Sequence, residues 1–227
     1  MRLKYYINEE NKGDDFSKIM NDLFDNCYPF IKELVGNHFS EFDKFLYSGR
    51  SNKPKFYRAK IRTNRRPLDT HPIIHDMIDK VLYEKFGFHA RSNALFCTGN
   101  AQKAYGYGIV YCIFPVGKYK YIWSPKIEDL YKYFSRKSEE ILMKIEDEKE
   151  YYKMKEKLKN KIKKIANSYK DTDLRAGIKS GNEIMLWAKE YIALDSLFYD
   201  DKLNYYFSEF GTQKPTPDKI QEVLENT

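Results

Sequence analysis

The sequence HARSNALFCTGNAQKAYGYG, residues 89–108, sets polar side chains directly before an apolar run. The three polar residues that precede the run ALFC are Arg91, Ser92 and Asn93. The run predicts a buried strand, so these side chains would stand at one end of it. The segment AYGYG follows, and tyrosine offers both a ring for stacking and a polar tip. A strand that only fills a core does not need this arrangement, and the pattern indicates a pocket.

Two more charged residues fall at predicted strands. Arg58 lies in KFYRAKIRT, where the alternation of side chains predicts a strand. Glu183 lies in SGNEIMLW, at the start of a predicted strand that follows the glycine-containing segment DLRAGIKSGN, expected to be a loop. An arginine, a serine and a glutamate therefore follow one another along the chain, each on or beside a strand.

This order of Arg58, Ser92 and Glu183 resembles the ADP-ribosyltransferase superfamily of the bacterial toxin and phage type. In that family an arginine on the first core strand precedes a serine-containing strand, and a glutamate ends the loop that faces the target. The segment NEIMLWAKEYIALD is similar to the closing segment of the family, and the resemblance covers roughly residues 54–200. It implies an α+β fold, with a split mixed β-sheet core, N-terminal helices and a helical insertion.

The resemblance implies a mono-ADP-ribosyltransferase, which cleaves the nicotinamide–ribose bond of NAD and transfers ADP-ribose to a protein or nucleic acid. Such a step passes through an oxocarbenium-like state, as in glycoside transfer. The Glu183 carboxylate would stabilise that state, and Ser92 would orient Glu183 or the ribose. The Arg58 guanidinium would clamp the phosphates or the ribose of NAD, which is the substrate that we expect.

The expected NAD-binding residues extend the catalytic set of Glu183, Ser92 and Arg58. They are Arg58, Arg62, Arg91, Ser92, Asn93, Tyr105 and Tyr107. Either tyrosine would form an aromatic wall for the nicotinamide ring. The sequence departs from the family at two places, since Ser92-Asn93-Ala94 stands where Ser-Thr-Ser is frequent and Gly181 stands where many relatives carry Glu or Gln. The second departure leaves the acceptor open among side chains, a nucleic-acid base and water.

The segment RAKIRTNRRPLDTHPIIH has two interpretations. It is either a basic turn before a helix, or a site where Arg62, Arg65 or Arg66 meets the NAD phosphates or a nucleic acid. His71 and His75 are four residues apart, but Pro72 lies between them and no third ligand is near. We therefore expect no metal site.

The net charge of +7 also permits a nucleic-acid partner, and much of it comes from the lysines of residues 149–164. These lysines form either a solvated helix face or a phosphate-binding patch. Two alternatives to the enzyme thus remain, namely a nucleic-acid-binding module and a catalytically degenerate relative that acts through interactions. The size and the Lys-, Tyr- and Asn-rich composition are similar to those of phage or phage-defence proteins.

The hydrophobic content of 42% and the aromatic content of 16% predict a chain with a substantial core. The three cysteines form no CxxC pair, which favours a reducing compartment. No secretory signal and no apolar run of membrane-spanning length is visible. We expect a monomer in the cytoplasm, with no membrane partner.

The expected domains are an N-terminal helical segment at residues 1–50 and a core at 51–227, with a helical insertion at about 126–170. Within 14–47 a helical stripe runs to Val35, Gly36-Asn37 breaks it, and a second helix through Phe39, Phe42, Phe45 and Leu46 precedes the loop YSGRSNKPK. Later predictions are helices at 72–86, near 100–106 and over 137–170, strands in GIVYCIFPVG and KYKYIWSP, and strand, turn and strand in EIMLWAKEYIALDSLFY.

Overall fold

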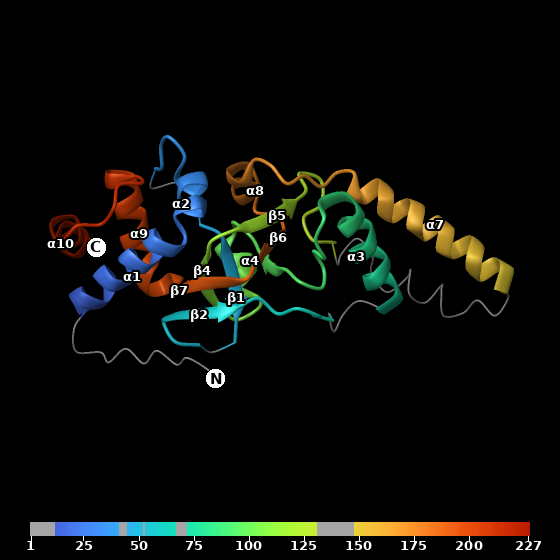
Figure 1. The fold of residues 1–227 in the computed structure, drawn as a ribbon, viewed down its shortest axis with the longest axis horizontal. Helices are drawn as coiled ribbons and strands as arrows, with labels where there is room; N and C mark the ends of the chain where they lie inside the picture. The colour runs from blue at the N-terminus through green and yellow to red at the C-terminus, as the bar shows by residue number, and fades with distance from the viewer. Residues whose placement is uncertain (1–11, 41–44, 52, 67–71, 131–147) are drawn as a thin grey trace. The chain divides into compact units, whose positions relative to one another are not determined.

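The structure is a computed structural model that describes residues 12–40, 45–51, 53–66, 72–130 and 148–227 (Figure 1). The described residues divide into two compact units. Unit 1 takes its residues from Met1–Lys60, Gly99–Tyr119 and Ala188–Thr227, and unit 2 from Ile61–Thr98 and Lys120–Trp187. Each unit holds one β-sheet with helices against it, so the prediction of an α+β protein is confirmed.

Unit 1 contains a four-stranded sheet in which each pair of neighbouring strands is antiparallel. In spatial order its strands are β1 (Tyr47–Arg50), β4 (Ile109–Pro115), β7 (Glu190–Asp195) and β2 (Phe56–Lys60). The central strands β4 and β7 are almost wholly buried, which explains their continuous apolar sequences. The edge strand β2 alternates between half-buried and exposed positions, as its sequence predicts.

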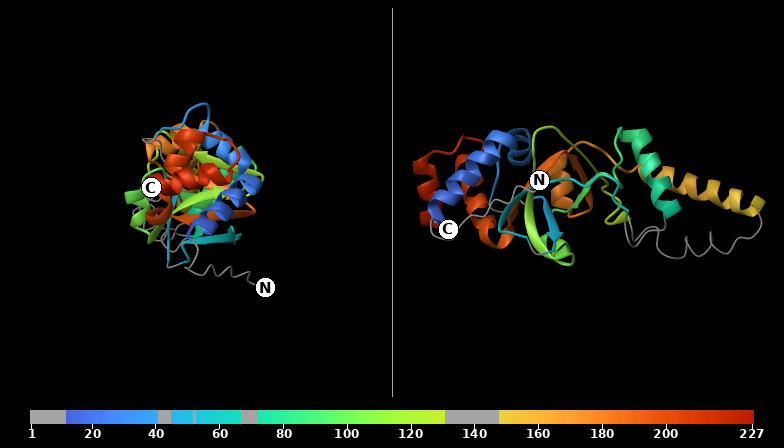
Figure 2. Two further views of the ribbon diagram at one scale, coloured as in Figure 1. Left: turned by 90° about the vertical axis from the view of Figure 1, so that its left-hand side faces the viewer. Right: turned by 60° about the horizontal axis from the view of Figure 1, so that its bottom comes forward.

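Helices from both ends of the sequence, together with the short helix α4 from its middle, complete unit 1. They are α1 (Lys12–Asn26), α2 (Tyr28–Val35), α4 (Ala101–Tyr105), α9 (Ser196–Phe210) and α10 (Pro217–Asn226). Figure 2 shows α1 beside the C-terminal helices, and α10 contacts both α1 and α9. The Phe45 ring lies 6.3 Å from that of Phe114 and 6.1 Å from that of Phe207, so aromatic side chains join the sheet to α9.

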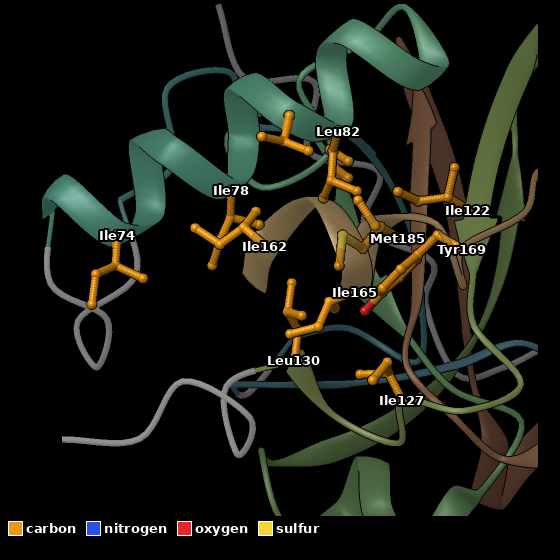
Figure 3. Close-up of a cluster of buried hydrophobic side chains, with 14 of the residues drawn as sticks. Ile74, Ile78, Leu82, Ile122, Ile127, Leu130, Ile162, Ile165, Tyr169 and Met185 are labelled. Carbon is orange, nitrogen blue, oxygen red and sulfur yellow. The ribbon is translucent and has the colours of Figure 1, made fainter. Parts of the chain in front are cut away.

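Unit 2 contains a three-stranded sheet in the order β3 (Leu95–Cys97), β6 (Ile184–Ala188) and β5 (Tyr119–Trp123). Its helices are α3 (Pro72–Phe86), α7 (Glu148–Ala166) and α8 (Leu174–Ser180). Figure 3 shows Ile78 and Leu82 of α3 in one apolar cluster with Ile162 and Ile165 of α7 and Met185 of β6. Full burial of one such side chain contributes about 1.5–3 kcal/mol, so this cluster fixes α3 and α7 against the sheet.

Most predicted elements are confirmed. The helix at 72–86 is α3, the short helix near 100–106 is α4, and the helical stripe that ends at Val35 forms α1 and α2. The strand predictions correspond to β2, β3, β4, β5, β6 and β7. Gly87 follows α3 with a φ of 71°, a conformation that favours glycine and ends the helix. Within the predicted helix over 137–170, residues 137–147 lie outside the described part and α7 ends at Ala166.

Three local predictions are wrong. Phe45 and Leu46 are not helical and lead into β1, so YSGR is a strand rather than a loop, while Phe42 lies outside the described residues. The segment after β7 is helix α9, because the Asp195 carboxylate accepts a hydrogen bond from the amide of Leu197 at 3.1 Å and caps it. The loop predicted in DLRAGIKSGN contains helix α8.

Candidate functional site

The buried side chain of Arg91 meets the half-buried side chain of Glu183 in unit 2. Glu183 directly precedes β6, and Arg91 lies in the turn that leads into β3, the strand paired with β6. Arg91 Nη1 is 3.7 Å from Glu183 Oε1, and the two side chains are 5% and 15% exposed. The guanidinium carbon of Arg91 also lies 4.8 Å from the centre of the Phe96 ring. Removing two charges from water costs free energy, and such pairs are found more often at functional sites. The pair is therefore a candidate for a binding or catalytic role.

The environment of Glu183 controls how readily its carboxyl ionises. Burial raises its pKa, the Arg91 charge opposes this, and the nearby Asp129 carboxylate adds to the increase, so the pKa stays above its ordinary value. The backbone amide of Leu130 lies 3.5 Å from Oε2 and favours the ionised form. Burial thus favours the neutral acid, and the Arg91 guanidinium is the main group that favours the ionised carboxylate.

The turn that carries Arg91 and Ser92 is fastened by Asp79 of α3, whose side chain is 8% exposed. Asp79 Oδ1 accepts hydrogen bonds from the amides of Arg91 at 2.8 Å and Ser92 at 3.3 Å. Asp79 Oδ2 accepts from the Ser92 hydroxyl at 2.6 Å and lies 2.9 Å from His89 Nδ1. One buried carboxylate therefore fixes both the backbone and the hydroxyl of the predicted serine site.

His75 lies one helical turn before Asp79 and contacts the same serine. Its Nε2 is 3.2 Å from Ser92 Oγ, and its ring is almost fully buried. Because the Ser92 hydroxyl hydrogen points to Asp79, the contact requires His75 Nε2 to carry a hydrogen and leaves Nδ1 as an acceptor. Burial lowers the pKa of His75, and the positive charge of Arg91 lowers it further. The imidazole is therefore held neutral.

Asp79 and His75 were not predicted as site residues. The sequence singles out His75 only through its spacing from His71, and Asp79 stands in DMIDKVLYEK among other charged side chains. A signal was present, because both positions share the face of α3 that carries Ile74, Ile78 and Leu82, where polar residues are expected to have partners.

The other unit 2 predictions lie around the same turn. The guanidinium carbon of Arg65 is 4.1 Å from the centre of the Phe96 ring, and the Arg65 amide donates to the Ser92 carbonyl at 2.8 Å. Asn93 Oδ1 accepts from the Asn64 amide at 3.1 Å. Arg62 is exposed, and His71 lies outside the described residues. Unit 2 thus brings Arg91, Ser92, Asn93 and Glu183 into one neighbourhood.

Three predicted site residues belong to unit 1. Arg58 lies on β2, where its Nε donates to Glu190 at 2.8 Å and its Nη1 lies 3.9 Å from an Asp22 oxygen. Its side chain is 36% exposed, so this is a surface ion-pair network. Tyr105 ends α4 and Tyr107 precedes β4, and their side chains are 68% and 75% exposed. The proposed clamp at Arg58 and the wall at Tyr105 or Tyr107 stay predictions.

Within the described part of the chain, no three His, Cys, Asp or Glu side chains are grouped so that they could hold a metal ion. Searching the same residues finds no helix with both the length and the hydropathy needed to cross a bilayer. No protein-family model matches the chain, and searches of curated proteins and of solved structures also find no match. The function of the chain is therefore inferred from the geometry around Glu183.

Proposed function

We propose that the chain is an NAD-dependent mono-ADP-ribosyltransferase with Glu183 as its catalytic carboxylate. The observation that carries the proposal is the buried pair of Arg91 and Glu183 beside Ser92, whose hydroxyl is fixed by Asp79. An α+β chain with a four-stranded and a three-stranded sheet is compatible with the ADP-ribosyltransferase-like fold that belongs to this proposal.

In the proposed reaction the bond between the nicotinamide nitrogen and the ribose C1′ breaks, and nicotinamide leaves with the bonding electron pair. Positive charge develops on the ribose, where a carboxylate bound to a ribose hydroxyl stabilises the transition state more than the ground state. Glu183 suits this role only when ionised, and Arg91 favours that form against the effect of burial. A nucleophilic atom of the acceptor then bonds to C1′ and releases its proton to solvent.

Ser92 would position the ribose or Glu183 in this scheme. Its hydroxyl already donates to Asp79, and its oxygen keeps a lone pair for a further donor. The guanidinium of Arg91, whose Nε is buried without a hydrogen-bond partner among the described residues, would hold the carboxylate or a phosphate oxygen.

The test is the release of nicotinamide from NAD by the full chain and by the Glu183→Gln variant. Glutamine keeps the size of the side chain and removes its charge, so we expect release to fall by about a hundredfold or more while the circular dichroism spectrum is unchanged. Glu156→Gln, at an exposed position of α7, is the matched control and should match the wild type. Equal release by wild type and Glu183→Gln would exclude this catalytic assignment and favour a degenerate relative.

Labelled NAD supplied with a cell lysate identifies the acceptor class. Protease and nuclease treatment of separate portions then shows whether the label is attached to protein or to nucleic acid. Label that survives both treatments in the small-molecule fraction indicates hydrolysis, with water as the acceptor.

A further inference from the structure

All four strands of the unit 1 sheet have a terminus at the same end of the sheet. The register places Arg50, the last residue of β1, opposite Ile109, the first residue of β4. It also places Tyr111 of β4 opposite Asp195, the last residue of β7, and Phe56, the first residue of β2, opposite Leu194. The segments that enter or leave the sheet at this end are therefore neighbours in the order of the strands.

Five large hydrophobic side chains are exposed in these segments. They are Tyr105 at 68%, Tyr107 at 75%, Ile109 at 37%, Leu197 at 84% and Phe198 at 41%. Only four other large hydrophobic side chains of the described residues are comparably exposed, so most of the exposed ones belong to segments at this end of the sheet. We call these five residues the sheet-end patch. Exposed apolar side chains that gather in one region commonly mark a binding surface.

Two glycines hold the tyrosines in place. A Cβ at Gly49 of β1 would lie 2.0 Å from the Ala104 carbonyl oxygen, and a Cβ at Gly108 would lie 2.3 Å from the Arg50 carbonyl oxygen. Only glycine permits such close approach, and Gly108 also has a φ of 127°. The segment with Tyr105 and Tyr107 is thereby fixed against β1, and both rings are presented to solvent.

Positive charges lie beside the patch. Lys53 and Lys55 are exposed, yet their backbone is fixed, because the Lys53 carbonyl accepts from the Tyr111 hydroxyl at 2.9 Å and the Lys55 carbonyl from the Asp195 amide at 2.7 Å. Lys55 Nζ lies 3.8 Å from the centre of the Phe198 ring. Lys103 of α4 is exposed as well, whereas Arg50, which ends β1, is half-buried and its guanidinium carbon lies 5.8 Å from the centre of the Tyr191 ring.

The acids nearby compensate little of this charge. Asp195 is buried and caps α9. Asp200 accepts hydrogen bonds from Tyr47 at 2.9 Å and from the Cys112 thiol at 2.6 Å, which directs it inward. Asp201 is exposed, against the three exposed lysines Lys53, Lys55 and Lys103. The patch therefore combines accessible rings with a net positive surface.

We propose that the sheet-end patch binds single-stranded nucleic acid, with bases stacked on Tyr105 and Tyr107 and phosphates held by Lys53, Lys55 and Lys103. Exposed rings beside fixed cations are the arrangement that binds unpaired strands. Protein interfaces are depleted in lysine, which disfavours a protein partner, and a second copy of the chain would bring like charges together. The proposal does not depend on the NAD chemistry, because binding requires no reaction at Glu183.

The experiment measures binding by fluorescence anisotropy, without NAD, to a labelled oligothymidylate of about 12 nucleotides and to a duplex of the same length. We expect the single strand to bind more tightly and the affinity to fall as salt rises. The double variant Tyr105→Ala, Tyr107→Ala should weaken binding to the single strand by about tenfold or more, because alanine removes the rings on which the bases stack. The matched Tyr105→Phe, Tyr107→Phe variant keeps both rings and should bind as the wild type does.

A second comparison separates this patch from the lysine-rich helix α7. Lys53→Gln with Lys55→Gln should lower affinity and flatten its salt dependence, whereas Lys157→Gln with Lys161→Gln should have little effect. Three outcomes would each overturn the proposal. The wild type does not bind at low salt, or the tyrosine-to-alanine variant binds with equal affinity and has an unchanged thermal unfolding curve, or only the α7 variant loses binding. Binding of polyglutamate that requires the two tyrosines, with no binding of oligonucleotide, would also overturn it in favour of an acidic protein partner.

Discussion

The guanidinium of Arg91 lies 3.7 Å from the carboxylate of Glu183, and neither side chain is more than 15% exposed. The pair joins the turn before β3 to the start of β6. Its members depend on each other, since removing one leaves the other charge buried without its main partner.

We predict that Arg91→Ala abolishes nicotinamide release at neutral pH and that the variant regains part of this activity at higher pH. Without the guanidinium, the raised pKa of Glu183 rises further, so the ionised form is reached only at more alkaline pH. The variant should also lose about 3–5 kcal/mol of unfolding free energy. The measurements are a pH–rate profile and urea denaturation. Arg91→Lys, which keeps the charge, should show a smaller shift, and an unshifted profile in Arg91→Ala would refute the pairing role.

We predict that Asp79→Asn destabilises the protein by about 2–4 kcal/mol and reduces NAD turnover. The buried carboxylate accepts bonds from Arg91, Ser92 and His89, and an amide cannot accept all of them because half of it is a donor. Asp76→Asn on the exposed face of α3 serves as the control and should change the unfolding free energy by less than about 0.5 kcal/mol. Equal effects of the two substitutions in urea denaturation would contradict this role for Asp79.

The neutral imidazole of His75 predicts a pH dependence of stability. Because its pKa in the folded protein is below the ordinary 6.5, the unfolded chain binds its proton first as pH falls. The contribution of His75 to stability is therefore complete at about pH 7.5 and is lost as pH falls below about 6.5 toward the lowered pKa. Urea denaturation of wild type and His75→Gln across this range should show a shallower pH slope in the variant. Parallel slopes would show that His75 titrates normally.

We predict that Gly177→Ala in α8 destabilises unit 2 by about 1–3 kcal/mol. A Cβ at this position would lie 2.9 Å from Cδ2 of Trp123. The ring cannot easily move, since it is buried and its Nε1 donates to the Thr172 carbonyl at 2.9 Å. Gly106→Ala is the control, because its Cβ would be 3.4 Å from the nearest atom and its backbone is already helical. A thermal unfolding midpoint of Gly177→Ala at or above that of Gly106→Ala would disprove the steric argument.

The sequence predicted most of the long elements because their apolar residues recur at one period. The face of α3 with Ile74, Ile78 and Leu82 and the unbroken apolar run of β4 are examples. Short elements were missed where a tertiary contact decides the conformation. YSGR contains a glycine and resembles a loop, but it pairs with β4, and Gly177 suggested a loop although the Trp123 ring requires glycine inside α8.

The candidate site was predictable where its residues adjoin in sequence or flank paired strands, as Arg91, Ser92 and Glu183 do. Asp79 was not predicted: helical spacing places it on the apolar face of α3, unlike the exposed Asp76, but spacing does not show that its partners are the amides and the hydroxyl of the turn before β3. The participation of Arg58 and of the two tyrosines stays a prediction, since their described contacts are all with residues of unit 1.

The position of β7 has a consequence for synthesis on the ribosome. β7 lies between β4 and β2 in the unit 1 sheet, and among the strands that the structure describes β2 pairs only with β7. Phe56 gains its partner in the ladder only after Leu194 has been synthesised, so β2 stays unpaired while the residues between the two strands are translated. The exposed, cationic side chains of Arg58 and Lys60 would disfavour pairing of the unpaired β2 with a strand of another chain.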